Sequence, residues 1–169
     1  SYQLALQQGS VSKSLSRLFQ IAFSVAKKVR TQTDIGVNPI SVAYLAVRLA
    51  ERIFAHISEQ SVLVIGAGDT ALLLFKHLCS AGVKNFFIAN RTVERSQDML
   101  RAVAAVDINI ELIDLSRVPE YLPRVDIVVA ATAAPLPIVG KGMVEQAIKL
   151  RKHRPMFMID LSVPRNIEQ

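Results

Sequence analysis

Short apolar runs alternate with longer amphipathic segments through most of this chain. Five of the runs are rich in β-branched and aliphatic residues and are typical of buried parallel strands. They cover residues 62–65, 86–89, 108–112, 126–131 and 156–159. Helical segments separate them, including residues 93–106 and 143–151, and Pro119 limits residues 115–121 to a short helical turn. This alternation predicts an α/β fold, a doubly wound parallel sheet with strand order 3-2-1-4-5.

The first part of the chain carries a helical pattern and no strand pattern. Apolar residues recur at i, i+3, i+4 and i+7, which predicts an amphipathic helix from Ser10 or Ser12 to about Arg30. Asn38-Pro39 is a helix start, and this next helix is expected to run to about Ile57. We therefore divide the chain into residues 1–37 and residues 38–169, with N-terminal helices preceding the sheet.

A glycine-rich turn follows the first strand. Its sequence, Gly66-Ala67-Gly68-Asp69-Thr70-Ala71, has the form G-x-G-x-x-A and opens an apolar helix. In a dinucleotide site the first glycine permits a tight turn, the second lets the pyrophosphate approach the backbone, and the small third residue packs the helix on the strand. The helix N-terminus also favours phosphate. We predict a Rossmann-like dinucleotide site; the alternative is a purely structural glycine turn.

The residues after the second strand indicate which dinucleotide binds. An NAD site usually has an acidic side chain there for the ribose hydroxyl, whereas this chain has Asn90, Arg91, Thr92 and, one turn later, Arg95. Two guanidinium groups, a hydroxyl and a helix N-terminus suit the extra phosphate of NADP. The predicted cofactor is NADPH; the alternative is that both arginines are solvated surface charges.

The charge, cysteine and aromatic content of the chain argue against some classes of function. Of the 20 basic residues, five precede Asp34, the first acid, and the rest of the chain holds 15 basic and 14 acidic residues. An ordinary solvated helix face explains this, and a polyanionic partner is the alternative. No apolar run reaches transmembrane length. A single cysteine suits a reducing cytoplasm, and the scarcity of aromatic residues argues against a stacking platform for single-stranded nucleic acid.

Residues that usually perform catalysis are poorly placed. Cys79 lies inside the helix that follows the glycine turn, so we expect an unreactive core thiol. The histidines, His56, His77 and His153, have no metal-ligand spacing. Asp160 ends a strand and is expected to cap a loop. We assign no catalytic residue and no metal ligand within the chain.

Four segments resemble glutamyl-tRNA reductase. They are LFQIAFSVAKKVRTQTDIG (18–36), VLVIGAG (62–68) with IANRT (88–92), ATAAPLPIVGKG (131–142) and IDLSVPRNI (159–167). The TDIG and PLPI-GKG segments are far more specific than the glycine turn. The resemblance implies an NADPH-dependent enzyme that opens tetrapyrrole (porphyrin) synthesis. A cysteine in an N-terminal catalytic domain forms a thioester with the glutamyl group, and reduction then releases glutamate-1-semialdehyde.

The resemblance also implies an organisation. Residues 1–37 would be the helical tail of an otherwise missing catalytic domain, and residues 38–169 the NADP-binding domain. A C-terminal dimerisation domain would be absent, so the chain alone should bind cofactor without turnover. The full-length enzyme would act on glutamyl-tRNA as a cytoplasmic homodimer without a membrane partner. The family pattern places the pyrophosphate and adenosine half at Gly66, Ala67, Gly68, Asp69, Thr70, Asn90, Arg91, Thr92 and Arg95, and the nicotinamide ribose near Ala131, Thr132 and Ala133.

Two other readings stay open. One is a shikimate dehydrogenase-like NADP oxidoreductase, whose cofactor domain also carries an NRT-type motif. Its Lys–Asp catalytic pair belongs to an N-terminal domain that this sequence does not resemble. The other is a nucleotide-sensing module without chemistry of its own.

Overall fold

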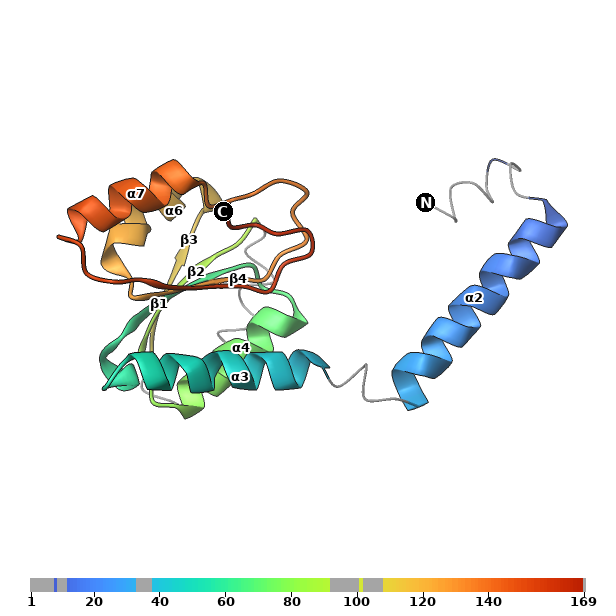
Figure 1. Ribbon diagram of the computed structural model, residues 1–169, viewed down its shortest axis with the longest axis horizontal. Coiled ribbons are helices and arrows are strands. Elements are labelled where there is room, and N and C mark those ends of the chain that lie inside the picture. Colours follow the sequence, from blue (N-terminus) through green and yellow to red (C-terminus); the bar gives the residue numbers. More distant parts are fainter. Residues whose placement is uncertain (1–7, 9–11, 33–37, 92–100, 102–107, 169) are drawn as a thin grey trace. The chain divides into compact units, whose positions relative to one another are not determined.

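Five parallel strands form one sheet in the computed structural model of this chain (Figure 1). The structure describes residues 8, 12–32, 38–91, 101 and 108–168. The strands are β1 (Ser61–Ile65), β2 (Asn85–Ala89), β3 (Asn109–Ile113), β4 (Ile127–Ala130) and β5 (Phe157–Asp160). Their order is β3-β2-β1-β4-β5. The predicted strand order and the α/β fold class are therefore confirmed.

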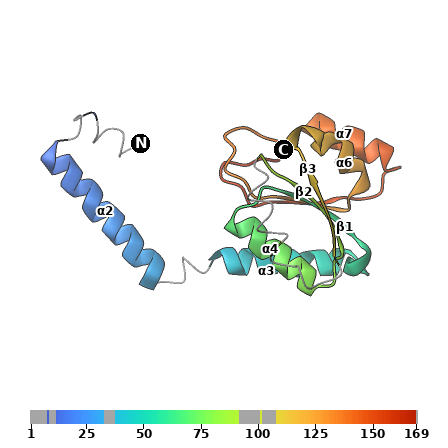
Figure 2. The same cartoon turned by 180° about the vertical axis from the view of Figure 1, so that it is seen from behind.

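Helices cover both faces of the sheet. Helices α3 (Asn38–Ile53) and α4 (Asp69–Ser80) lie on one face, and α6 (Val118–Tyr121) and α7 (Lys141–Leu150) on the other (Figures 1 and 2). Short 3₁₀ turns, η3 (Leu115–Arg117) and η4 (Leu122–Arg124), flank α6. The segment 115–121 was predicted to form only a short helical turn because of Pro119, and it does so. The helix predicted over residues 93–106 lies outside the described residues.

The central strand β1 joins two hydrophobic cores. Val62 and Val64 pack in the cluster that contains the buried residues of α3 and α4. Leu63 and Ile65 pack in the cluster that contains Ala147 of α7. All four side chains are fully buried, which is why the strand reads as an unbroken apolar run and not as an alternating one.

Two helix boundaries differ from the prediction. Helix α3 ends at Ile53, four residues before the predicted Ile57, and the chain then enters the 3₁₀ turn η2 (Ile57–Glu59). Phe54 and Ile57 both pack against the core, so the chain bends there to follow it into β1. Helix α7 begins at Lys141, two residues before the predicted start, with Gly140 as its N-cap.

The chain divides into two compact units, residues 1–38 and 39–169. In the first unit, helix α2 (Lys13–Gln32) is amphipathic, as the spacing of its apolar residues predicts. The Ser12 hydroxyl accepts a hydrogen bond from the Leu15 N–H at 3.3 Å. Ser12 therefore caps this helix, one of the two starts that the sequence left open. No helix in the described part of the chain is long and apolar enough to span a membrane.

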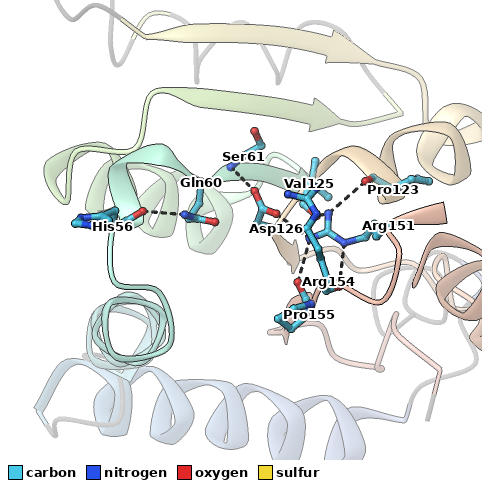
Figure 3. Close-up of polar contacts among 9 residues, drawn as sticks. All are labelled: His56, Gln60, Ser61, Pro123, Val125, Asp126, Arg151, Arg154 and Pro155. Atoms are coloured by element: carbon cyan, nitrogen blue, oxygen red, sulfur yellow. Dashed lines mark hydrogen bonds and ion pairs between the residues drawn. The ribbon is translucent and has the colours of Figure 1, made fainter. Parts of the chain in front are cut away.

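A buried arginine ties together the amino ends of the strands (Figure 3). Arg151, at the end of α7, is 4% exposed. Its guanidinium is 2.8 Å from the carboxylate of Asp126, which in turn accepts a hydrogen bond from the Ser61 N–H at 3.2 Å. The guanidinium also donates to backbone carbonyl oxygens of Pro123, Val125, Arg154 and Pro155. One side chain thus fixes the starts of β1, β4 and β5.

We expect Arg151→Met to lower the free energy of unfolding by about 3–5 kcal/mol, because it leaves a partly buried carboxylate and several carbonyl oxygens without their donor. Lys149→Met, on the exposed side of the same helix, should change it by less than ~0.5 kcal/mol. Urea unfolding followed by far-UV circular dichroism measures both values. A loss below about 1 kcal/mol for Arg151→Met would contradict this account.

Candidate functional site

A cavity of about 540 Å³ lies at the carboxyl edge of the sheet. It is bordered by the segments that leave β1, β2 and β4, with single residues after β3 and β5. This is the position where open parallel sheets bind ligands, since crossovers to opposite faces leave a crevice between neighbouring strands. Ten of the predicted site residues line it: Gly66, Ala67, Gly68, Asp69, Thr70, Asn90, Arg91, Ala131, Thr132 and Ala133.

Gly66 makes the turn that opens the cavity. Its φ is +105°, a conformation that only glycine adopts without strain. A Cβ atom at this position would also lie 2.4 Å from the carbonyl oxygen of Ala131. The glycine is therefore required by the protein itself, because the turn after β1 passes directly against the residue that follows β4.

Gly68 is a glycine for a different reason. Its φ is −84° and its ψ 177°, an extended backbone that any residue adopts. A Cβ atom there would meet no protein atom within 4 Å. Neither backbone geometry nor internal packing requires glycine at this position, which itself lines the cavity.

The first turn of α4 borders the same space. Gly68 is its N-cap and has no side chain that could accept hydrogen bonds from the N–H groups of this turn. Asp69 and Thr70 line the cavity, and Ala71 is fully buried against the sheet. Amide groups and the positive end of the helix dipole are thus available to an anion.

The polar residues after β2 border the cavity beside this helix. Asn90 and Arg91 both line it, and Arg91 is exposed. Leu115, after β3, adds an apolar side chain to the same border. A cation, an amide and an aliphatic group together suit a phosphorylated nucleoside. The two other predicted residues of this half, Thr92 and Arg95, lie outside the described residues.

The segment after β4 forms another side of the cavity, and hydrogen bonds fix its path. The Thr132 N–H donates to the Ser162 hydroxyl at 3.1 Å, and the Thr132 hydroxyl donates to the amide oxygen of Asn166. The Ala134 N–H donates to that same Thr132 hydroxyl at 2.9 Å. The threonine side chain is therefore engaged within the protein, and the segment offers the cavity mainly small side chains and backbone.

Asp160 holds the loop that carries Ser162 and Asn166. Its carboxylate accepts hydrogen bonds from the N–H groups of Ser162, Asn166 and Ile167 at 2.8–2.9 Å. Burial raises the pKa of Asp160, but these hydrogen bonds outweigh it and keep the pKa below its ordinary value. Asp160 is thus an ionised loop cap, as the sequence predicted.

The cysteine and the histidines lie away from the cavity lining. Cys79 is partly buried, and burial raises the pKa of its thiol to about 11. A thiol with such a pKa is protonated at neutral pH and is a poor nucleophile. Among the described residues, no group of three or more His, Cys, Asp or Glu side chains is placed to hold a metal ion.

Sequence reasoning missed part of this site. Leu115, Ala134, Pro135, Ile138 and Leu161 complete the cavity lining, and Ser162 and Asn166 support it from behind. Asn166 belongs to the segment 159–167, whose sequence alone indicates no role for this residue. No local pattern marks Asn166, because it stands between Arg165 and Ile167 in a loop and the partners of its side chain lie about thirty residues earlier in the chain.

Comparison with known proteins places this fold in a family. Residues 48–169 match the family model of shikimate / quinate 5-dehydrogenase. The chain belongs to this family. The match covers the sheet, the glycine turn and every cavity-lining residue named above.

Several similar proteins are glutamyl-tRNA reductases. The chain is 53% identical to that of Hahella chejuensis over 95% of its own length, and 52% identical to that of Marinobacter nauticus over 99%. The glutamyl-tRNA reductase of Methanopyrus kandleri superposes on 99% of the chain and 41% of its own chain, with a TM-score of 0.66 and 32% identity. The resemblance read from the sequence is confirmed.

The chain spans 37% and 38% of the length of the two bacterial relatives. It is therefore similar to one part of those enzymes. The family model, named for shikimate and quinate dehydrogenases, begins at residue 48, whereas the similarity to the reductases also includes α2.

We expect Gly66→Ala and Gly68→Ala to separate the two glycine roles. Gly66→Ala forces an unfavourable φ and a clash with Ala131, and should lower the free energy of unfolding by at least ~1–3 kcal/mol. Gly68→Ala adds a methyl group to empty space and should change it by less than ~0.5 kcal/mol. Urea unfolding compares them, and similar losses for both would contradict the assignment.

Proposed function

We propose that this chain is the NADPH-binding part of a glutamyl-tRNA reductase. The whole protein would reduce glutamyl-tRNA to glutamate-1-semialdehyde in the first step of tetrapyrrole biosynthesis. The observation that carries this proposal is the sequence identity of about 50% to such reductases along nearly the whole chain. The cavity supports it, since its lining suits a dinucleotide.

The residues fit the cofactor in three places. The space at Gly68 and the first turn of α4 would hold the pyrophosphate. Asn90, Arg91 and Leu115 would hold the adenosine and its 2′-phosphate. The remaining border, from Ala131 to Pro135, would receive the nicotinamide riboside. When bound, NADPH supplies the hydride for the reduction, and these residues bind and orient it.

NADPH is proposed over NADH because of the charges after β2. Asn90 stands where an NAD-binding domain usually has an acid, and such an acid would repel a 2′-phosphate. Arg91 is exposed at the cavity, where its guanidinium could meet that phosphate. Thr92 and Arg95 remain predicted members of this subsite. The homodimer and the cytoplasmic location that the resemblance implies also remain predictions.

The whole reaction needs a nucleophilic cysteine that residues 1–169 do not offer. Cys79 is the one cysteine in the sequence, and its raised pKa keeps it protonated. We propose that the thioester forms on a cysteine of the N-terminal catalytic domain, which the resemblance to glutamyl-tRNA reductases implies for the whole protein. Residues 1–37 would be the end of that domain, and residues 38–169 the cofactor domain.

A shikimate dehydrogenase-like enzyme is the second candidate, and the family model of that name favours it. Reduction of NADP by shikimate, measured with the full-length protein, would support this candidate over the reductase. A nucleotide-sensing module without chemistry would bind NADPH but would show neither activity.

We predict that the chain binds NADPH and that Gly68→Val abolishes this binding while the fold survives. The branched side chain would occupy the space proposed for the pyrophosphate, and no protein atom is displaced by its Cβ. Calorimetric titration with NADPH measures binding, and urea unfolding verifies the fold. Unchanged NADPH affinity in Gly68→Val would mean that the phosphates bind elsewhere. In the full-length enzyme, the same substitution should stop formation of glutamate-1-semialdehyde from glutamyl-tRNA.

We predict that Arg91→Ala weakens NADPH binding roughly ten- to hundredfold, the equivalent of one charge-assisted hydrogen bond of about 1.5–3 kcal/mol. NADH, which lacks the 2′-phosphate, should bind nearly as before. The dependence of NADPH binding on salt should also become flatter.

The control is a parallel titration of both cofactors against wild type, Arg91→Ala and Arg91→Ala/Arg95→Ala. The double variant is the stricter test because Arg95 could compensate. Equal losses for NADPH and NADH would indicate that these arginines support the fold or the adenine and do not select the phosphate.

A further inference from the structure

Asn166 is a buried polar side chain behind the cavity. It is fully buried, and its side chain contacts three residues of the segment after β4. The amide oxygen accepts from the Thr132 hydroxyl, and the amide nitrogen donates to the carbonyl oxygens of Ala134 at 3.0 Å and Leu136 at 3.3 Å. Only a side chain with both an acceptor and donors satisfies all three groups.

The backbone of Asn166 extends the same contact. Its carbonyl oxygen accepts from the N–H groups of Ile138 at 2.8 Å and Val139 at 3.0 Å. Its own N–H donates to Asp160 at 2.8 Å, which anchors it to the end of β5. A single residue therefore fastens the segment from Thr132 to Val139 to the neighbouring strand exit.

This segment borders the cavity on the side away from β2. Ala131, Thr132, Ala133, Ala134, Pro135 and Ile138 all line the cavity, whereas Asn166 does not. The phosphate and adenosine positions proposed above use the turns after β1, β2 and β3. The part of the cavity that Asn166 supports is the part left for the other half of the dinucleotide.

We propose that Asn166 is a positioning residue for the nicotinamide half of the cofactor. It acts through Thr132 and the backbone of residues 131–136, and it touches neither the phosphates nor the adenosine. This inference rests on the proposed function, because it assumes that the cavity binds NADPH. It assigns a part in hydride transfer to a residue that lies behind the site.

The proposal predicts that the two halves of the cofactor respond differently to Asn166→Ala. The substitution frees the Thr132 hydroxyl and two carbonyl oxygens, so the border near the nicotinamide loses its fixed path. NADPH affinity should fall roughly tenfold, the equivalent of about one ordinary hydrogen bond. Adenosine 2′,5′-bisphosphate carries only the adenosine half, and its affinity should stay within about twofold.

A spectroscopic measurement tests positioning directly. With NADPH at saturation, the fluorescence anisotropy of the reduced nicotinamide ring should be lower in Asn166→Ala than in the wild type. A role limited to folding would not change this value among molecules that are folded and saturated. The anisotropy therefore separates loss of positioning from loss of stability.

The matched control is Arg151→Lys at the opposite edge of the sheet. Arg151 is also buried and also bonds to loop carbonyl oxygens, but it lies outside the cavity lining. This variant should be destabilised and yet bind NADPH and adenosine 2′,5′-bisphosphate with the wild-type ratio of affinities. A changed ratio in Arg151→Lys would overturn the proposal, since any destabilisation would then produce the effect.

The remaining outcomes are decisive as well. If Asn166→Ala lowered the affinities for NADPH and adenosine 2′,5′-bisphosphate equally, or lowered neither, the positioning role would be overturned. The proposed cofactor site would not be affected by either result. If the wild type bound neither ligand, the proposed function itself would fail. Should Asn166→Ala not fold, Ser162→Ala removes the acceptor of the Thr132 N–H together with a side-chain hydrogen bond to Asp160. It tests the same border of the cavity, with a smaller expected difference between the affinity losses for the two ligands.

Discussion

The central strand β1 imposes the constraint on which the rest of the structure depends. It is hydrogen-bonded to β2 on one side and β4 on the other, and its residues from Val62 to Ile65 are fully buried. The chain leaves β1 through α4 on one face of the sheet, and it reaches β4 through α6 on the other. The cavity lies at the carboxyl end of β1, between these two crossovers.

The two halves of this cavity are built by different means. The half beside Gly66 and Gly68 follows from a local sequence, a strand, a glycine turn and a helix N-terminus within about ten residues. The opposite border depends on Asp160 and Asn166, which lie about thirty residues further along the chain than the segment they support. The quoted segments 131–142 and 159–167, on which the family resemblance partly depended, are therefore in direct contact.

This difference explains what the sequence could predict. The five strands, their order, the turn at Gly66 and the loop cap at Asp160 follow from local patterns and general topology rules. The support given by Asn166 is a relation between two distant loops, and no periodicity or spacing encodes it. The early end of α3 at Ile53 had the same origin, since packing of Phe54 on the core overrides helical propensity.

Buried polar side chains hold both edges of the sheet, Arg151 at the amino edge and Asn166 at the carboxyl edge. Replacing both partners of a buried ion pair by well-packed apolar residues is often neutral for stability, whereas removing one partner alone is not. What an apolar side chain cannot do is fix where a loop carbonyl lies, because dispersion is not directional. Several hydrogen bonds from one side chain specify a single path for each loop. At the amino edge this specificity fixes the starts of β1, β4 and β5, whereas at the carboxyl edge the fixed loop is also a border of the cavity.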